Sequence, residues 1–288
     1  MNELKIRAYA KLNLYLDITG KRPDGYHELK TVMQTIDLYD ELEFTLSEGS
    51  GIEILCDKQG VPTDENNLIY DGIMSVISYA YFQPGCKITV RLKKNIPSQA
   101  GMGGGSSDCA AAIAAMNKLF RLEMSADEMR ECGKMCGADV PFLICGGTAL
   151  CEGIGEKITQ LEPVNDMYIA VIKPSEAIST PQAYKLFDEK GTENAGNYKK
   201  KKKALKDNVQ LGRNLYNAFT DSCAIKAVDD AIEILDICGA YGAEMTGSGS
   251  AVFGIFDSKE KAEKAVERAS TPFGGVYVPV NCGNTIIK

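Results

Sequence analysis

The sequence contains no tryptophan, one histidine and no pair of cysteines with C-x-x-C spacing. A single histidine leaves almost no material for a Cys/His zinc site, which takes four such ligands. The longest uninterrupted apolar run, 109–116, has eight residues, against the roughly 18 needed to cross a bilayer. Charged residues alternate with apolar ones over the first seven positions, so a signal-peptide core is lacking. We therefore expect a cytoplasmic protein that does not enter a membrane.

An excess of positive charge is also lacking. Lysine and arginine number 32 against 39 aspartates and glutamates, a net charge of −7, so the chain as a whole has no attraction for nucleic acid. The length of 288 residues and the 44% hydrophobic content fit about two ordinary globular domains or one large one. The ten cysteines are expected to be free thiols that act as small apolar core residues.

Hydrophobic periodicity predicts an α+β protein in two lobes, 1–161 and 162–288. The predicted strands and helices do not alternate strictly, as they would in an α/β protein, and the helices exclude an all-β protein. Segment 189–208 is the poorest in apolar residues, and its run Lys199–Lys203 is expected to be a solvated loop. Strand patterns cover 12–18, 28–38, 42–46, 52–56, 86–92, 147–151, 168–172, 251–256 and 276–280, and helical patterns cover 68–80, 109–119, 125–137, 222–238 and 259–269.

A glycine-rich segment at 97–107, called here the glycine loop, follows a predicted strand and leads into a predicted helix. Four of the five residues 101–105 are glycine, which removes the side chains that would keep a polyphosphate away from backbone amides. The helix start adds unpaired amides and the positive end of its dipole, and Ser106 and Ser107 can cap it. Ser106 stands where a dinucleotide fingerprint needs glycine, and a Walker A lysine is lacking. The alternative is a flexible surface loop.

Two charged residues and a second glycine turn are ambiguous by themselves. Lys11 lies in the first strand beside Asn13, on the face opposite Leu12, where a solvated charge is the more common case. Asp139 opens a helix begun by proline, where its ordinary role is to stabilise the helix dipole. The turn at 245–250 before a strand is ordinary too. Spacing alone does not bring these segments together.

In this order, the segments resemble the GHMP small-molecule kinases, named for galactokinase, homoserine kinase, mevalonate kinase and phosphomevalonate kinase. The resemblance covers nearly the whole chain. Arg-Pro-Asp-Gly-Tyr-His at 22–27 is its most specific part, since the wider family shares the glycine loop but not this segment. The matching segments are 10–14, 21–29, 97–107, 137–142, 147–149, 153–156, 173–174, 179–181 and 245–250.

The resemblance implies an N-terminal lobe like the second domain of ribosomal protein S5 and a ferredoxin-like C-terminal lobe. It implies ATP and Mg²⁺, and phosphorylation of the 2-hydroxyl of a methylerythritol carrying a cytidyl diphosphate, in the non-mevalonate route to isopentenyl diphosphate. Lys11 and Asp139 would form the catalytic pair. The triphosphate would lie on Pro97, Ser98, Gln99, Ala100, Gly101, Met102, Gly103, Gly104, Gly105, Ser106 and Ser107, and the cytidyl substrate on Asn13, Tyr26, His27, Thr180 and Tyr184.

The expected partner is thus a small molecule, without nucleic acid or membrane, and the expected state is a monomer or weak homodimer. Two positions depart from the family pattern. Met102 stands where leucine is usual, a near-isosteric change, and Asn217-Ala218 stands where relatives often have Asn-Asp. The alternatives are another GHMP kinase of the homoserine or mevalonate type, a non-catalytic nucleotide-binding regulator on the same fold, and a nucleic-acid binder that uses the lysine run.

Overall fold

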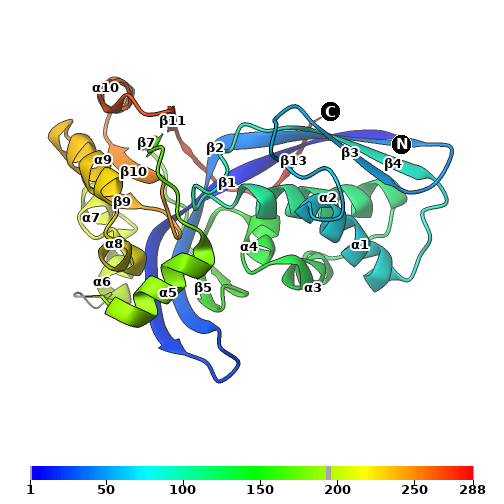
Figure 1. Ribbon diagram of the computed structural model, residues 1–288, viewed down its shortest axis with the longest axis horizontal. Coiled ribbons are helices and arrows are strands. Elements are labelled where there is room, and N and C mark those ends of the chain that lie inside the picture. The colour runs from blue at the N-terminus through cyan, green and yellow to red at the C-terminus, as the bar shows by residue number, and fades with distance from the viewer. Residues whose placement is uncertain (1, 193–195, 288) are drawn as a thin grey trace.

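Two long antiparallel strands run through the whole molecule (Figure 1). The computed structural model describes residues 2–192 and 196–287. Strand β1 (Glu3–Lys21) and strand β2 (His27–Ser47) are paired along most of their length and joined by a turn at 22–26, called here the hairpin turn. The predicted strands 28–38 and 42–46 are therefore parts of one strand.

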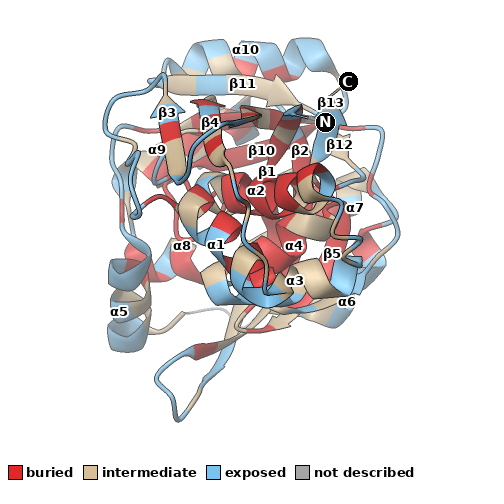
Figure 2. Cartoon of the chain, turned by 90° about the vertical axis from the view of Figure 1, so that its right-hand side faces the viewer, coloured by how far each residue is buried: buried red, intermediate tan, exposed pale blue. Residues whose placement is uncertain are grey.

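The hairpin forms the centre of the N-terminal sheet, whose strands follow the order β13-β1-β2-β4-β3. Strand β5 pairs with β2 and with β6, and β8 pairs with β1. Helices cover one face, and Figure 2 shows the buried residues between them and the strands. These elements are β3 (Ile52–Cys56), α1 (Leu68–Ala80), β4 (Lys87–Lys93), α2 (Gly104–Phe120), α3 (Ala126–Cys136), α4 (Val140–Cys145), β5 (Thr148–Gly153), β6 (Lys157–Gln160) and β8 (Tyr216–Asn217).

The second sheet is antiparallel with the order β11-β7-β10-β9. Its strands are β7 (Tyr168–Lys173), β9 (Ala243–Met245), β10 (Val252–Phe256) and β11 (Phe273–Tyr277), and its helices are α9 (Lys226–Ile237) and α10 (Lys259–Ala269). Numbered along the chain, the strands lie as fourth, first, third, second, with a helix after the first and third. This confirms the ferredoxin-like expectation.

Both faces of the second sheet are buried. Along β7, Ala170 and Ile172 pack in the cluster that includes the two helices, whereas Ile169 and Val171 share a cluster with Leu12 of β1. Because strand side chains alternate between faces, β7 reads as a continuous apolar run. One of the three hydrophobic clusters is therefore a core shared by the two lobes across β1 and β2.

The chain returns to the first sheet at its end. Strand β12 (Pro279–Val280) pairs with β2, and β13 (Thr285–Ile287) pairs with β1. The single predicted strand 276–280 is wrong, because β11 ends at Tyr277 and β12 belongs to the other sheet.

In segment 189–208, the lysine run is a helix and not the expected loop, and one of its five lysines is buried; the other four are exposed, as expected. Residues 193–195 of that segment lie outside the described residues, but the segment begins within α5 (Thr180–Lys190), and the lysine run forms α6 (Tyr198–Ala204). Lys201 is only 1% exposed, and its ammonium donates to the carbonyls of Leu211 and Asn214 at 3.4 and 3.3 Å. Helix α7 (Asn208–Gly212) follows.

The predicted helix 222–238 is two helices, α8 (Ala218–Cys223) and α9. Ala224 ends α8 in the left-handed conformation at φ 47°, which breaks the helical path. All ten cysteines are free thiols, as expected, and four of them are buried. No helix within residues 2–192 and 196–287 combines the length and apolarity needed to span a bilayer.

Candidate active site

The glycine loop lies where β1 meets the N-terminus of α2. Helix α2 begins at Gly104, five residues before the predicted start, so Ser106 and Ser107 lie in its first turn rather than at its cap. The expected serine cap is therefore wrong: the cap is Gly103, at φ 70°, with no side-chain hydrogen bond. The first intrahelical bond runs from the Ser107 amide to the Gly103 carbonyl at 2.8 Å. The preceding amides of α2 thus lack an acceptor within the helix.

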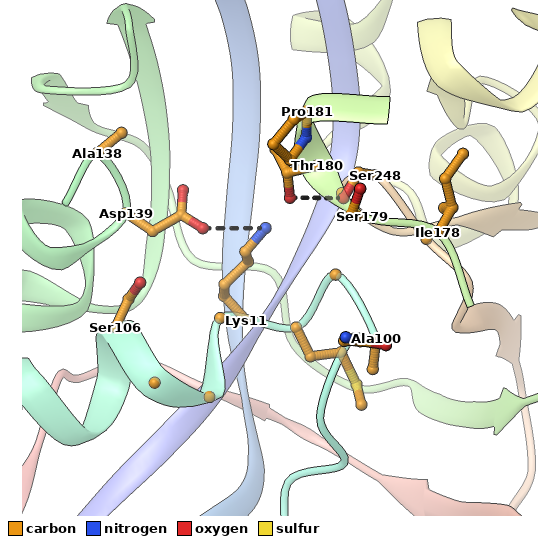
Figure 3. A pocket seen from close by; sticks show the side chains of 18 of the residues that line it. Lys11, Ala100, Ser106, Ala138, Asp139, Ile178, Ser179, Thr180, Pro181 and Ser248 are labelled. Atoms are coloured by element: carbon orange, nitrogen blue, oxygen red, sulfur yellow. Dashed lines mark hydrogen bonds and ion pairs between the residues drawn. The ribbon is translucent and has the colours of Figure 1, made fainter. Parts of the chain in front are cut away.

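The two serines differ in what they can do. The Ser107 hydroxyl is buried and donates to the Tyr9 carbonyl at 2.7 Å, which ties α2 to β1. Ser106 is half-buried and lies in the wall of the cavity beside Asp139 (Figure 3). Only Ser106 presents its hydroxyl to a ligand there.

Lys11 and Asp139 come together, as Figure 3 shows, with 3.4 Å between the ammonium and the carboxylate. Lys11 is 3% exposed, so the solvated reading is wrong. Asp139 precedes α4, yet its side chain makes no capping bond. Its carboxylate is thus directed to Lys11 rather than to the helix end. A Cβ at Gly103 would lie 3.2 Å from the Lys11 side chain, so a glycine lets the lysine lie against the loop.

Asn13 connects the first strand to the second glycine turn, residues 245–250. Its Oδ1 accepts from the Lys11 ammonium at 2.7 Å and from the Gly247 amide at 3.0 Å, while its Nδ2 donates to Thr31 at 2.9 Å. The backbone amide of Asn13 donates to the Thr246 hydroxyl at 3.0 Å. The turn is therefore part of the site and not an ordinary strand connection.

Irregularities in the β1–β2 pairing help to place both turns. The register shifts between Tyr9 and Lys11 and again between Asn13 and Tyr15. The Lys11 amide donates to the Met102 carbonyl at 3.0 Å, and the Asn13 amide donates to Thr246. Bulges commonly redirect backbone groups beside functional sites. Met102, the unusual residue of the glycine loop, is buried in the shared core, as its size predicts.

Asn217 has a structural role. Its Nδ2 donates to the carbonyls of Met245 and Gly247, both at 2.8 Å, and its Oδ1 caps α8 by accepting from the Phe219 amide. The side chain is 2% exposed. It thus holds the second glycine turn in place.

A further group of expected site residues lies between the hairpin turn and α5. The His27 ring stacks on Tyr184, with ring centroids 4.7 Å apart and an angle of 21°. The Thr180 hydroxyl is 3.0 Å from that of Ser248 in the second glycine turn (Figure 3). Tyr26 is 62% exposed on the hairpin turn. Burial raises the pKa of Tyr184 to about 12, so its hydroxyl stays neutral.

One cavity of about 1140 Å³ joins the Lys11–Asp139 pair, most of the glycine loop and the His27–Tyr184 stack. Its wall includes residues expected from the sequence and others that were not, among them the polar residues Asn67, Lys94, Asp108, Asp188 and Ser248. Asp188 binds His27 Nε2 at 2.7 Å and Lys21 at 2.5 Å. Its only sequence signal is a position four residues after Tyr184 in a helix, which is visible only once His27 is known to face that helix.

A buried charge cluster supports the start of α2. The Lys94 ammonium binds Asp40, and it binds Asp108 at 2.6 Å. All three side chains are at most 6% exposed. Desolvation raises the pKa of Asp108, whereas the two carboxylates raise that of Lys94 in spite of its burial. Lys94 is thus a fixed cation beneath the glycine loop.

Comparison with known proteins agrees with this geometry. The model of the GHMP kinase N-terminal domain matches residues 67–147, and that of the GHMP kinase C-terminal domain matches residues 201–274. A 4-diphosphocytidyl-2-C-methyl-D-erythritol kinase of Clostridium botulinum (strain Alaska E43 / Type E3) is 41% identical over 96% of this chain and 99% of the relative.

Solved structures agree as well. The crystal structure of a 4-(cytidine 5'-diphospho)-2C-methyl-D-erythritol kinase has a TM-score of 0.79 at 28% identity, covering 97% of this chain and 100% of that one. A homoserine kinase from Cytophaga hutchinsonii has a TM-score of 0.78 at 20% identity, covering 100% and 98%, and shares the fold.

These matches place the chain among the GHMP kinases, which are ATP-dependent small-molecule kinases. The α+β fold expected from the resemblance is confirmed. Within that class, the chain belongs to the 4-diphosphocytidyl-2-C-methyl-D-erythritol kinase family.

Proposed function

We propose that the chain transfers the γ-phosphoryl group of ATP to the 2-hydroxyl of 4-diphosphocytidyl-2-C-methyl-D-erythritol, giving the 2-phosphate and ADP in the non-mevalonate route to isopentenyl diphosphate. The observation that carries the proposal is the Lys11–Asp139 pair at 3.4 Å, in one cavity with the glycine loop and the His27–Tyr184 stack. These groups would supply a phosphate site, an acid–base pair and an aromatic site within one cavity.

ATP would lie with its triphosphate on the glycine loop. The unpaired amides at the start of α2 and the positive end of its dipole favour an anion. Phosphoryl transfer has a loose transition state, so positioning and charge neutralisation dominate its catalysis. Positioning supplies roughly 7–11 kcal/mol, whereas one general base contributes about 10²–10⁴-fold in rate.

Asp139 would accept the proton of the acceptor hydroxyl as the new bond forms. Lys11, 3.4 Å from this carboxylate, would hold it in place and steady the transferred phosphoryl group. Asn13 supports the pair, because its bond to the Lys11 ammonium fixes the lysine side chain. Tyr26, His27, Thr180 and Tyr184 would bind the cytidyl end.

Mg²⁺ fits this site as an ion held largely by the nucleotide. Among the described residues, no three His, Cys, Asp or Glu side chains come together as a metal site. Mg²⁺ in kinases usually keeps several waters and binds phosphates with one or two protein oxygens. The Asp139 carboxylate and the Ser106 hydroxyl are such oxygens in the cavity wall. When bound, the ion neutralises charge on the β- and γ-phosphates.

ADP release against a panel of alcohols tests the proposal. We expect turnover with the cytidyl-linked methylerythritol and none with homoserine or mevalonate. Asp139→Asn should lower kcat by about 10²–10⁴-fold while ATP binding, measured by calorimetry, is retained. The control is Glu263→Gln on the exposed side of α10. Near-full turnover by Asp139→Asn would remove the carboxylate from the mechanism.

A further inference from the structure

Three side chains of α5 converge on the chain's only histidine. Tyr184 stacks on the His27 ring, Phe187 meets it edge-on at 6.3 Å and 89°, and Asp188 accepts from it at 2.7 Å. Positions 184, 187 and 188 are three and four residues apart, so they lie on one side of the helix. The His27 side chain is 8% exposed. Its plane and one of its nitrogens are thus fixed before any ligand arrives.

The identity of the fixed nitrogen decides what the other can do. Asp188 contacts Nε2. Lys21 first, and then His27, lower the pKa of Asp188 through hydrogen bonds, so this group is an ionised carboxylate that can only accept. The proton of a neutral imidazole must then lie on Nε2, which leaves Nδ1 as an acceptor. Within residues 2–192 and 196–287, no other side chain bonds the ring.

We infer that Asp188 is a positioning residue that holds the His27 proton on Nε2, so that Nδ1 accepts a hydrogen bond from the exocyclic amine of a cytosine and disfavours uracil. The inference rests on the proposed function, because it takes the cavity beside His27 as the site of the base. Cytosine carries an amine where uracil carries a carbonyl oxygen. A bare nitrogen facing that oxygen leaves two acceptors without a donor.

Lys21 serves the same arrangement from the other strand. Its ammonium binds the second oxygen of Asp188 at 2.5 Å, which leaves the first oxygen to His27. The hairpin turn between these residues is itself fixed, since the Tyr26 amide donates to Asp24 and the Arg22 amide donates to the Tyr26 carbonyl. Asp188 therefore joins the hairpin to α5 at the base site.

The first measurement is of the proton itself. Because the chain has one histidine, a ¹⁵N spectrum of tag-free protein reports His27 without assignment. We expect a protonated Nε2 and a bare Nδ1 in the wild type, and a mixture of tautomers in Asp188→Ala. Asp188→Glu, which keeps a carboxylate, should restore most of the wild-type pattern. Two protonated nitrogens in the wild type at pH 7.5 would overturn the inference, as would a spectrum that Asp188→Ala leaves unchanged.

The second measurement is of base selection, with ATP and the cytidyl or uridyl form of the substrate. Wild type should favour the cytidyl form. Asp188→Ala should lower kcat/KM for it about 10- to 100-fold, mainly through KM, and leave the uridyl value and the KM for ATP nearly unchanged. Equal losses on both bases, or a base preference within twofold of wild type, would overturn the inference.

Two controls separate the possible causes. Glu189→Ala removes the neighbouring carboxylate of α5, which pairs with Lys185 at 3.9 Å, and should leave both readouts at wild-type values. Lys21→Met breaks the other bond of Asp188 and should leave the tautomer on Nε2. Wild type that turns over neither form would refute the proposed function, whereas the spectrum still tests the role of Asp188.

Discussion

Replacing Gly101 by alanine should separate the two glycine turns. Gly101 lies at φ +71°, and an added Cβ would come 2.0 Å from the Thr246 carbonyl oxygen and 3.1 Å from the Gly249 amide nitrogen. Both neighbours are backbone atoms, which cannot rotate away as a side chain can. Because Cβ contacts under 3.0 Å essentially do not occur, one turn must move by about 1 Å.

The expected loss has two parts. Left-handed backbone costs alanine about 1 kcal/mol relative to glycine, and overpacking adds about 1–3 kcal/mol. Gly51→Ala isolates the first part, since Gly51 lies at φ +92° with nothing within 4 Å of its Cβ position. A shift of about 1 Å in a positioning loop can also lower the rate by about 10²-fold. We expect that loss in kcat/KM only for Gly101→Ala.

Urea unfolding and initial-rate kinetics on both variants and the wild type test this reasoning. Gly51→Ala should lose about 1 kcal/mol in the free energy of unfolding and keep its activity. Gly101→Ala should lose more than 1 kcal/mol in the free energy of unfolding, and its kcat/KM should fall about 10²-fold. If it matched Gly51→Ala in both, the contact between the turns would have no part in catalysis.

Three other results are expected. Lys94→Met leaves Asp40 and Asp108 buried without a cation, so the free energy of unfolding should fall by about 3–5 kcal/mol in urea titrations; a loss under 1 kcal/mol would contradict this. Burial raises the pKa of Glu244 from 4.5 to about 7, so its contribution to stability is present below pH 4.5 and lost as pH rises through about 7. The free energy of unfolding of Glu244→Gln, relative to that of the wild type, should therefore rise by about 2–3 kcal/mol between pH 5 and 8. The same pH dependence of this free energy in both proteins would refute the prediction. Tyr26→Ala should raise the KM for the cytidyl substrate and not that for ATP, in initial-rate assays; equal KM values for wild type and variant would contradict its assignment to the base.

The parts of the site that lie within one segment could be predicted from the sequence. The glycine loop has a local signal, because its residue types set its backbone. The proximity of Lys11 to Asp139 came instead from the family resemblance, since each residue alone favoured an ordinary role. What the sequence could not supply was the partner of each segment: Asn13 meets Gly247, 234 positions away, through a bond that leaves no local pattern.

The buried charge of Lys201 is the reason why the prediction for the lysine run failed in part. Five lysines in a row indicate a solvated segment by composition. In the fold, Lys201 faces the core, and burial lowers its pKa to about 7 while two carbonyls accept its hydrogen bonds. Tertiary packing buries one lysine of the run, and the composition of the segment does not distinguish this lysine from the other four. Strand β13 was missed for a similar reason, because its partner β1 lies at the opposite end of the chain.

Because β1 and β2 pass through both lobes, they restrict movement of one lobe relative to the other. Swinging the halves apart would bend strands of 19 and 21 residues and break their ladder of hydrogen bonds. A hinge motion of one lobe against the other, which closes the site in some two-domain enzymes, would therefore cost part of this pairing.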